Sequence, residues 1–448
     1  MSVSWTAEQV LALAPDASST KSGSDLATPR KWVSLGQAEH ALWGECQGSG
    51  ANPYQTQIDL REPAFKCSCP SRKFPCKHAL GLFLLFVNQP NAFSRSQPPQ
   101  WVTDWLTARD KRAEKAAEKK EARTDKHPDT AAQAKRAAQR ENKVKAGLQE
   151  LDIWLSDLVR TGLANVQTRP YSFWESIAAR MVDAQAPGIS RMLKQMAEIP
   201  ATGDGWQERL LGRIAMLHLL LEGYKRIDAL SEEAQSDIKS LIGWTQDRED
   251  ILAKQGIRDR WFVAGQRAYE EDRLRVQRTW LWGQESRRAA LILDFSHISQ
   301  PISNNGLIPG SWIDAELVFF PGSYPIRALI KDKEAAHSEL EAAIGFDSIK
   351  SALNTYSSVL AVCPWVAVDD FPVVLHSANI INKNGRWIIT DSDGCIMPVS
   401  RQCRSTWQIL SISGGHKIGM MGEWDGEFLL PLAVWTSGRF YNVINNDY

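Results

Sequence analysis

The sequence predicts an α+β multidomain protein: a small ββα unit, a charged helical linker, a helical domain and a C-terminal, mostly antiparallel β domain. The chain has 448 residues, of which 43% are hydrophobic, so it is long enough for about three domains that each bury a core. Apolar residues recur at helical spacing in the middle of the chain and form short runs between turn residues after it. A charged stretch with few apolar residues separates the N-terminal unit from both.

The net charge of the chain is zero, because 52 lysines and arginines balance 52 aspartates and glutamates. This balance excludes a uniformly basic nucleic-acid-binding protein and an acidic disordered tail protein. The charge is not evenly spread. Residues 1–147 hold 22 basic and 15 acidic side chains, whereas residues 148–448 hold 30 and 37. The chain is therefore polarised into a basic N-terminal third and an acidic remainder.

The sequence predicts a cytoplasmic protein without a membrane contact. Residues 1–25 lack the basic and apolar runs of a signal peptide. The longest apolar stretch, Ala79 to Val87, is far shorter than the roughly twenty residues that span a membrane. Of the seven cysteines, three lie close together, and clustered cysteines in a reducing compartment more often bind metal than form disulfides.

The N-terminal unit follows an N-terminal segment, residues 1–29, and covers residues 30–90. Ala41 to Gln47 and Tyr54 to Leu60 have the pattern of two strands around a glycine-rich turn. A third extended piece runs from Ala64 to Cys69, and the apolar stretch Ala79 to Val87 is predicted to be the helix that closes the unit.

A cysteine and histidine motif lies between the last extended piece and this helix. Cys67 and Cys69, one residue apart, project from the same side of an extended strand. Cys76 and His78 cannot face one point from inside an ideal helix, but they can if Cys76 precedes the helix and His78 lies in its first turn. Pro75 favours that arrangement. Three thiolates and one imidazole are a known tetrahedral ligand set for structural zinc.

The four residues Cys67, Cys69, Cys76 and His78 resemble the SWIM zinc-finger family, whose pattern is Cys-x-Cys, a variable gap and Cys-x-His. The resemblance covers about residues 30–90 and implies one bound zinc ion, with DNA binding or protein interaction as the usual role. The overall organisation also looks like bacterial SWIM proteins that are often encoded beside a MoxR-type AAA+ ATPase and a von Willebrand A-type protein. These two proteins are the partners that the resemblance implies.

The four candidate ligands fill a zinc coordination shell and leave no open position for water, so the zinc is predicted to be structural. The candidate phosphate-binding residues are the basic side chains around the motif: Lys66, Arg72, Lys73 and Lys77. Cys46 is close in sequence and is interpreted as a small buried strand residue rather than a spare ligand.

The linker, residues 91–147, is rich in alanine and in charged residues. A solvated helix or a flexible linker is favoured there over a basic arm that binds nucleic acid, because charged runs rarely bury a face. The helical domain, residues 148–256, carries two apolar stripes at helical spacing, the first of which begins at the end of the linker, and we interpret both as core. Their members are Val144, Leu148, Leu151, Leu155 and Leu158 in the first, and Leu210, Ile214, Leu217, Leu221 and Tyr224 in the second.

The β domain, residues 257–448, contains short apolar strand candidates at 291–293, 317–320 and 373–375. Asn384-Gly385 and Asp425-Gly426 each lie between two such runs and predict hairpins. One helix is expected near Lys333 to Ile344. The segment from Asp391 to Gly394 is similar to the start of a calcium loop but lacks its later acidic ligands, so a β-turn is the better interpretation.

We expect a zinc-binding adaptor that binds protein or nucleic acid and has no catalysis of its own. The alternative is an enzyme with its active site in the β domain. That site would require a pocket that brings together groups such as Cys363, His376, Asp391 and His416.

Overall fold

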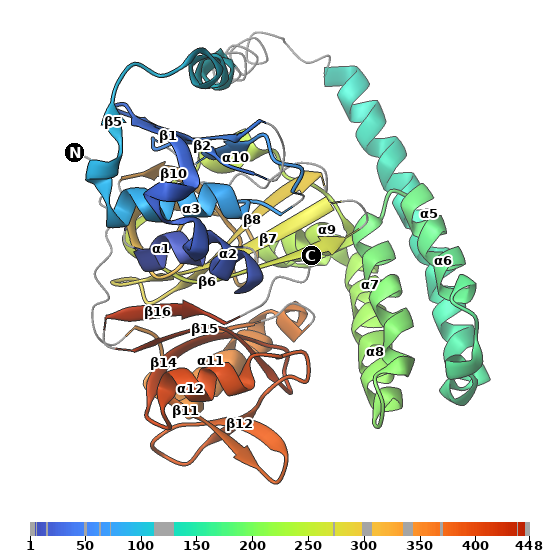
Figure 1. Cartoon of the computed structure of the whole chain (residues 1–448). Helices are drawn as coiled ribbons and strands as arrows, with labels where there is room; N and C mark the ends of the chain where they lie inside the picture. The colour runs from blue at the N-terminus through green and yellow to red at the C-terminus, as the bar shows by residue number, and fades with distance from the viewer. Residues whose placement is uncertain are drawn as a thin grey trace.

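The computed structural model describes most of the chain. The described residues are 5, 7–14, 17–48, 52–61, 64–71, 73–111, 130–271, 274–297, 307–334, 344–367, 371–436 and 438–443. They form an α+β structure with an N-terminal sheet, a helical region and two C-terminal sheets, as the sequence predicts (Figure 1). Within these residues no helix combines the length and the apolar character that a membrane span requires.

The N-terminal sheet has five strands in the order β4-β3-β2-β1-β5. Four of them form an antiparallel meander, and β5 adds to β1 in parallel. The strands are β1 (Trp32–Gln37), β2 (Ala41–Cys46), β3 (Tyr54–Asp59), β4 (Ala64–Cys67) and β5 (Ser94–Arg95). The predicted strands correspond to β2, β3 and β4, whereas β1 and β5 extend the expected ββα unit to a larger sheet.

Helices cover both faces of this sheet. Alternation along β2 places Leu42 in the core under α3 (Lys77–Asn88), while Ala41 and Trp43 pack against Val102 of a helix at residues 100–111. On its other side, α3 contacts α1 (Ala7–Ala12) and α2 (Ala17–Leu26). The predicted helix is therefore present as α3, and it lies between the sheet and two further helices.

The described part of the predicted linker consists of ordered elements on either side of residues 112–129, which lie outside the described residues. Residues 94–111 contact the N-terminal sheet. Arg109 pairs with the buried carboxylate of Asp59 at the end of β3, and Arg61 pairs with the same carboxylate. The helix α5 (Thr130–Thr161) begins after the gap and continues into the helical region.

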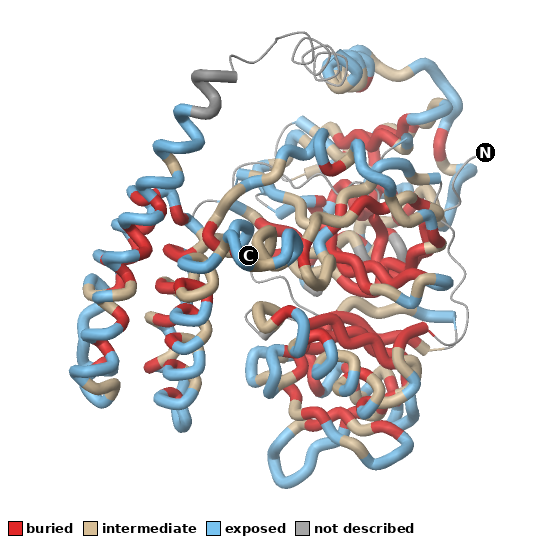
Figure 2. Tube along the Cα trace, turned by 180° about the vertical axis from the view of Figure 1, so that it is seen from behind, coloured by how far each residue is buried: buried red, intermediate tan, exposed pale blue. Residues whose placement is uncertain are grey.

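The helical region packs around a single apolar core, and Figure 2 shows its buried residues on the facing sides of the helices. Both predicted stripes lie in this core, with Tyr224 at its margin. After α5 the helices are α6 (Ser172–Asp183), α7 (Pro187–Glu198), α8 (Trp206–Lys225), α9 (Glu232–Ile242) and α10 (Arg248–Leu252), with short 3-10 turns at Leu163–Thr168, Ile199–Ala201 and Ile227–Ala229.

The C-terminal region contains two antiparallel sheets that pack face to face. The first has the order β10-β9-β6-β7-β8 and the second the order β13-β12-β11-β14-β15-β16. Phe262 and Trp280 of the first sheet meet Met421 and Leu432 of the second in a shared apolar core. The first sheet comprises β6 (Ile257–Glu271), β7 (Leu274–Gly283), β8 (Ala289–His297), β9 (Trp312–Phe319) and β10 (Ala328–Lys333). The second comprises β11 (Phe371–Lys383), β12 (Arg386–Thr390), β13 (Ile396–Pro398), β14 (Ile418–Trp424), β15 (Leu429–Thr436) and β16 (Arg439–Asn442).

Both predicted hairpins are present, at the β11–β12 and β14–β15 turns. Asn384 and Gly385 both have positive φ, as the tight turn requires. The expected helix near Lys333 to Ile344 is not tested over residues 335–343, which lie outside the described residues, and Lys333 itself ends β10. The helices of the described C-terminal residues are α11 (Ile349–Val362) and α12 (Thr406–Ser413), neither of which was predicted.

Candidate metal centre

The four motif residues come from a strand end, a loop and a helix start. Cys67 is the last residue of β4, and Cys69 follows it after one residue. Cys76 has extended backbone angles and directly precedes α3, and His78 is in the first turn of that helix. The structure thus confirms the arrangement by which a Cys-x-His pair can converge on one point.

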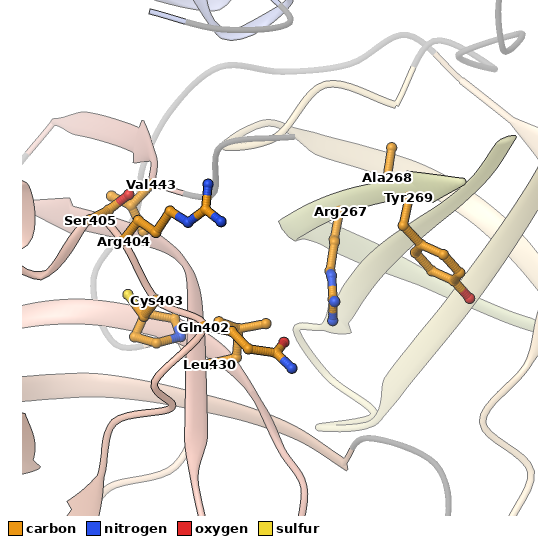
Figure 3. A pocket seen from close by; sticks show the side chains of 10 residues that line it. Arg267, Ala268, Tyr269, Gln402, Cys403, Arg404, Ser405, Leu430 and Val443 are labelled. Carbon is orange, nitrogen blue, oxygen red and sulfur yellow. The ribbon is translucent and has the colours of Figure 1, made fainter. Parts of the chain in front are cut away.

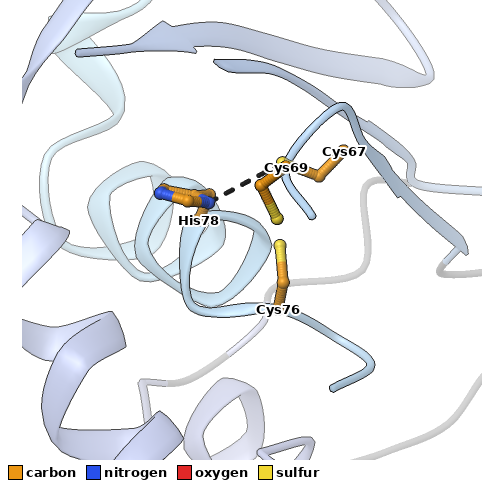
Figure 4. A group of neighbouring side chains, drawn as sticks. All are labelled: Cys67, Cys69, Cys76 and His78. Carbon is orange, nitrogen blue, oxygen red and sulfur yellow. Dashed lines mark hydrogen bonds between the residues drawn. The ribbon is translucent and has the colours of Figure 1, made fainter. Parts of the chain in front are cut away.

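The ligand atoms of the four residues all lie within 4.8 Å of one another. Figure 4 shows the three thiols and the imidazole facing a common centre, with Cys67 Sγ 3.8 Å from His78 Nδ1. A tetrahedral zinc ion with bonds of about 2.3 Å to sulfur and about 2.0 Å to nitrogen separates these two atoms by about 3.5 Å. The observed distance therefore fits a shared zinc ion.

Neighbouring groups orient the candidate ligands. Cys76 and His78 are each only 5% exposed, and the His78 ring lies against Tyr54 with ring centroids 4.9 Å apart. The Thr56 hydroxyl is 3.2 Å from Cys67 Sγ, and the backbone N–H of Ala79 bonds the sulfur of Cys76. Outer contacts of this kind hold metal ligands in position and stabilise thiolates.

Hydrogen bonds among the three thiols and the imidazole shift the pKa values of these groups in opposite directions. Hydrogen bonds from Cys67 and Cys76 lower the pKa of the Cys69 thiol, and hydrogen bonds with Cys67 and Cys69 raise that of Cys76. Burial alone would lower the pKa of His78, but its hydrogen bonds with Cys67 and Cys69 outweigh burial and raise the pKa to about 9. Metal binding at this cluster must therefore release protons.

The donor chemistry fits one structural Zn²⁺ held by three sulfurs and one nitrogen. Cys46, the last residue of β2, is fully buried in the apolar core, and its pKa is raised chiefly by burial, which fits a strand core residue. The predicted phosphate-binding lysines Lys66, Lys73 and Lys77 are exposed around the cluster. Arg72 lies outside the described residues.

A second group with metal-binding side chains already pairs with a lysine. Asp152, His218 and Glu222 bring their ligand atoms together on the exposed side of the helical region. The ammonium group of Lys225 lies 2.9 Å from Asp152 and 2.6 Å from Glu222. The lysine raises the local positive charge and lowers the pKa of Glu222, so we interpret the group as a surface ion-pair network.

The residues of the alternative enzyme site have separate structural roles. Asp391 accepts hydrogen bonds from the backbone N–H groups of Ile349 and Asp393, at the N-terminal end of α11. Cys363 follows the C-terminal end of the same 14-residue helix, about 21 Å away. His376 contacts the carbonyl oxygen of Phe346 at 3.0 Å, and His416 is exposed after α12. No common pocket gathers these four groups within the described residues.

The structure also shows whether the segment from Asp391 to Gly394 is a calcium loop or a β-turn. The carboxylate is buried, and its oxygens are occupied by backbone N–H groups of its own loop and of α11. The β-turn interpretation of this segment is therefore confirmed.

Comparison with known proteins identifies two regions of the chain. Residues 54–86 match the family model of the SWIM zinc finger, and residues 139–242 match that of the SWIM-associated four-helix bundle domain. No curated protein and no solved structure matches the chain. The first match contains all four candidate ligands, and the second covers the helical region from within α5 to the end of α9. The chain therefore contains a SWIM zinc finger followed by a SWIM-associated four-helix bundle domain.

Proposed function

We propose that this protein is a zinc-containing adaptor that joins macromolecular partners and has no catalysis of its own. One observation carries the proposal: the zinc finger holds an exposed, basic loop in place with a filled ligand shell. Three sulfurs and one nitrogen converge within 4.8 Å, which leaves no ligand position for a reactive water. Thiols of this kind stay available to zinc in a reducing cytoplasm, where we place the protein.

The surface that meets a partner is the loop between β4 and α3. Within α3 the residues from His78 to Leu85 are buried, so this helix is not free to enter a DNA groove. The loop and the strand and helix ends beside it instead expose Lys66, Lys73 and Lys77, together with Phe74, whose side chain is 37% exposed. A basic surface that includes an exposed aromatic side chain suits an acidic partner.

For a nucleic-acid partner, the lysines of the loop and the basic segment from Lys111 to Lys145 would contact phosphates. Affinity would then fall by orders of magnitude between about 50 and about 200 mM salt if six or more contacts form. The test is fluorescence anisotropy with labelled DNA of mixed sequence and a variant in which Lys66, Lys73 and Lys77 are changed to Glu. We expect that variant to lose binding.

A charge-matched control separates local contacts from net charge. Lys350, Lys383 and Lys417 are exposed in the C-terminal region, so changing these three to Glu alters the net charge equally. Binding that is weak in both variants, or that does not respond to salt, would rule out the nucleic-acid form of the proposal.

For a protein partner, the acidic helical and β regions supply further surface. The expected partners are a MoxR-type AAA+ ATPase or a von Willebrand A-type protein. The test is co-purification from the native host at two salt concentrations, followed by mass spectrometry and zinc analysis. Retention of one such partner by the wild type, and its loss in the Lys66, Lys73 and Lys77 variant, supports binding through the zinc loop. Equal retention by both proteins contradicts it.

A further inference from the structure

A cavity of about 130 Å³ lies beside the C-terminal end of α5, where the chain turns back toward α6. The part of its lining that comes from α5 is spaced by three, one and three positions, so these side chains lie on one face of the helix. They are Trp154, Asp157, Leu158 and Thr161. The rest of the lining belongs to the connection and to the first turn of α6: Gly162, Asn165, Val166, Arg169 and Phe173.

The connection after α5 brings the second half of the lining beside the first. Gly162 follows the last residue of α5 with a φ of +86°, a left-handed conformation that glycine adopts without a steric penalty. The chain then forms the 3-10 turn Leu163–Thr168, in which the Thr168 hydroxyl donates a hydrogen bond of 2.9 Å to the carbonyl oxygen of Asn165. Asn165 and Arg169 are thereby placed next to the last turns of α5.

Aromatic rings form one wall of the cavity. The rings of Trp154 and Phe173 are half-buried, and their centroids lie 5.2 Å apart. The buried Trp174 contacts both rings edge-on and holds them in place. The guanidinium carbon of Arg169 lies 5.2 Å from the centroid of the Phe173 ring. The lining thus offers aromatic faces and a guanidinium plane on which a flat ring can stack.

Three polar side chains of the lining have no hydrogen-bond partner among the described residues. They are the carboxylate of Asp157, the amide of Asn165 and the guanidinium group of Arg169, all three exposed to solvent. One carboxylate and one guanidinium group leave the lining without net charge. A neutral ligand that has both donors and acceptors can use all three groups, whereas a simple cation or anion would be repelled by one of the two charges.

The cavity between the two C-terminal sheets differs in this respect. Figure 3 shows Arg267 on the wall of that cavity, whose volume is about 80 Å³. Arg267 donates a hydrogen bond to the buried carboxylate of Glu423 on β14, which also accepts hydrogen bonds from Arg278 and the Trp280 indole. Burial alone would raise the pKa of Glu423, but the two arginines outweigh it and lower the pKa. Arg267 is therefore already paired, unlike the charged groups beside α5.

We propose that the cavity beside α5 binds one unpaired guanine base, stacked on the aromatic wall and held at its edge by Asp157 and Asn165. A carboxylate accepts hydrogen bonds and donates none, and guanine is the base whose Watson–Crick edge carries two adjacent N–H donors. The Asn165 amide can donate to the guanine O6 atom next to them. The base can belong to a free nucleotide or to single-stranded nucleic acid.

The size of the cavity fits one base and no more. A closed cavity of about 150 Å³ holds one benzene-sized ring. The cavity beside α5 has exposed polar residues at its rim, so a base can insert its rings and keep its polar edge at that rim. The site is separate from the zinc loop and does not rest on the adaptor function.

The test is isothermal titration calorimetry of the full-length, zinc-loaded protein with guanosine monophosphate and, separately, with adenosine monophosphate. We expect saturable binding of the guanosine nucleotide at one site. The adenosine nucleotide should bind about tenfold more weakly or worse, because adenine has an acceptor nitrogen where guanine has an N–H donor. The phosphate group is the same in both, so it does not contribute to the difference.

Asp157→Asn should weaken binding of the guanosine nucleotide by about tenfold or more, since hydrogen bonds to a charged acceptor are lost. Asp183→Asn is the matched control, because Asp183 is an exposed carboxylate at the end of α6 that does not line the cavity. Its affinity should equal that of the wild type. Arg169→Gln provides a second, smaller change of about twofold to tenfold, and it decides the matter if circular dichroism shows that Asp157→Asn is misfolded.

A pentanucleotide with one central deoxyguanosine among deoxythymidines distinguishes the two sources of the base. Tighter binding of this strand than of the monophosphate identifies single-stranded nucleic acid, and equal or weaker binding identifies a free nucleotide. Absence of saturable binding, equal affinity for the two nucleotides, or equal affinity in the wild type, Asp157→Asn and Arg169→Gln would overturn the proposal. Binding of N-acetylarginine amide in place of the nucleotides would also overturn it, because the occupant would then be a basic side chain.

Discussion

The N-terminal sheet and the paired C-terminal sheets each enclose a buried polar cluster, but only one of the two clusters carries its own counter-charge. Three cysteines and His78 converge beside the N-terminal sheet with no lysine or arginine among them. Between the C-terminal sheets, Glu423 is neutralised by Arg267 and Arg278 from the same chain. The first cluster therefore depends on a cation from outside, while the second is complete on folding.

Because of this difference, the two clusters respond to different conditions. Zinc supply and pH act on the N-terminal cluster through its ligands, because protons and metal compete for the same atoms. The C-terminal cluster contains groups that stay charged across the neutral range. Four predictions follow, from the largest expected effect to the smallest, and the first three test this contrast.

Loss of one zinc ligand should give the largest effect. Cys69→Ser removes a thiolate from a cluster in which structural zinc contributes on the order of 10 kcal/mol to folding. Zinc content should fall from one ion per chain to almost none, and residues 30–90 should become sensitive to protease. Metal analysis and limited proteolysis with mass spectrometry measure both.

The matched control for this variant is Cys395→Ser, because Cys395 is half-buried in the C-terminal region and outside the cluster. It should keep its zinc. If residues 30–90 of Cys69→Ser resist protease without zinc, the metal does not hold this sheet together.

Acidification should weaken zinc binding but leave the C-terminal sheets intact. Without metal the His78 pKa is about 9, so below that pH the imidazole carries a proton that zinc must displace, together with thiol protons. Affinity therefore falls as pH falls, by at least about tenfold per unit between pH 8 and 6. Competition with a chelator measures it.

The Glu423 pKa is lowered, so its contribution to stability is present above the unfolded-state pKa and is lost only at more acidic pH. Near-ultraviolet circular dichroism of the C-terminal tryptophans should accordingly not change between pH 8 and 6.

For the zinc cluster, an affinity for zinc that is constant between pH 8 and 6 would argue against thiolate ligands.

Removal of the C-terminal counter-charge should have a smaller but substantial effect. Glu423→Gln removes the carboxylate that Arg267 and Arg278 share, which should lower the free energy of unfolding by about 3–5 kcal/mol. Zinc content should stay at one ion per chain. Chemical denaturation followed by tryptophan fluorescence measures the loss, and Glu427→Gln, an exposed change in the β14–β15 turn, is the control. Equal stability of the two variants would show that the cluster is not neutralised as described.

The smallest effects come from two glycines in helices. A Cβ atom at Gly81 would lie 2.7 Å from Leu26 Cβ, so Gly81→Ala should force α2 away from α3 and cost about 1–3 kcal/mol. Gly212 is exposed in α8 with no atom within 4 Å of the added Cβ, so Gly212→Ala should stabilise its helix by about 0.5–1 kcal/mol. Thermal unfolding monitored by circular dichroism should give opposite signs. Equal signs would contradict the close α2–α3 contact.

Local patterns in the sequence predict the elements that depend on neighbours in the chain. The strands β2 and β3, the hairpin at Asn384 and the apolar stripe of α5 all follow from spacing over a few residues. The metal cluster is also predictable, because its four ligands lie within 12 residues and zinc chemistry restricts their type.

Contacts between distant segments left no such pattern. The strand β5 joins β1 across more than fifty residues with only two paired positions. The helix α2 has few apolar side chains, so its sequence does not predict its contact with α3. Thr56 supports Cys67 from the neighbouring strand and is visible only once the β3–β4 register is known. Arg267 and Glu423 pair across the two C-terminal sheets from separate parts of the chain, and no spacing rule connects them.

The covering of α3 by α1 and α2 determines which fragment a protein engineer can transplant. Residues 54–86 contain all four zinc ligands. A fragment cut at those limits would lose the packing contacts that β2 and the N-terminal helices make with Leu82 and Phe83. Residues 7–111 keep the sheet, both layers of helices and the Asp59 ion pairs together. A portable zinc module cut from this protein therefore needs roughly three times the length of its recognisable motif, estimated from the extent of the buried contacts around it.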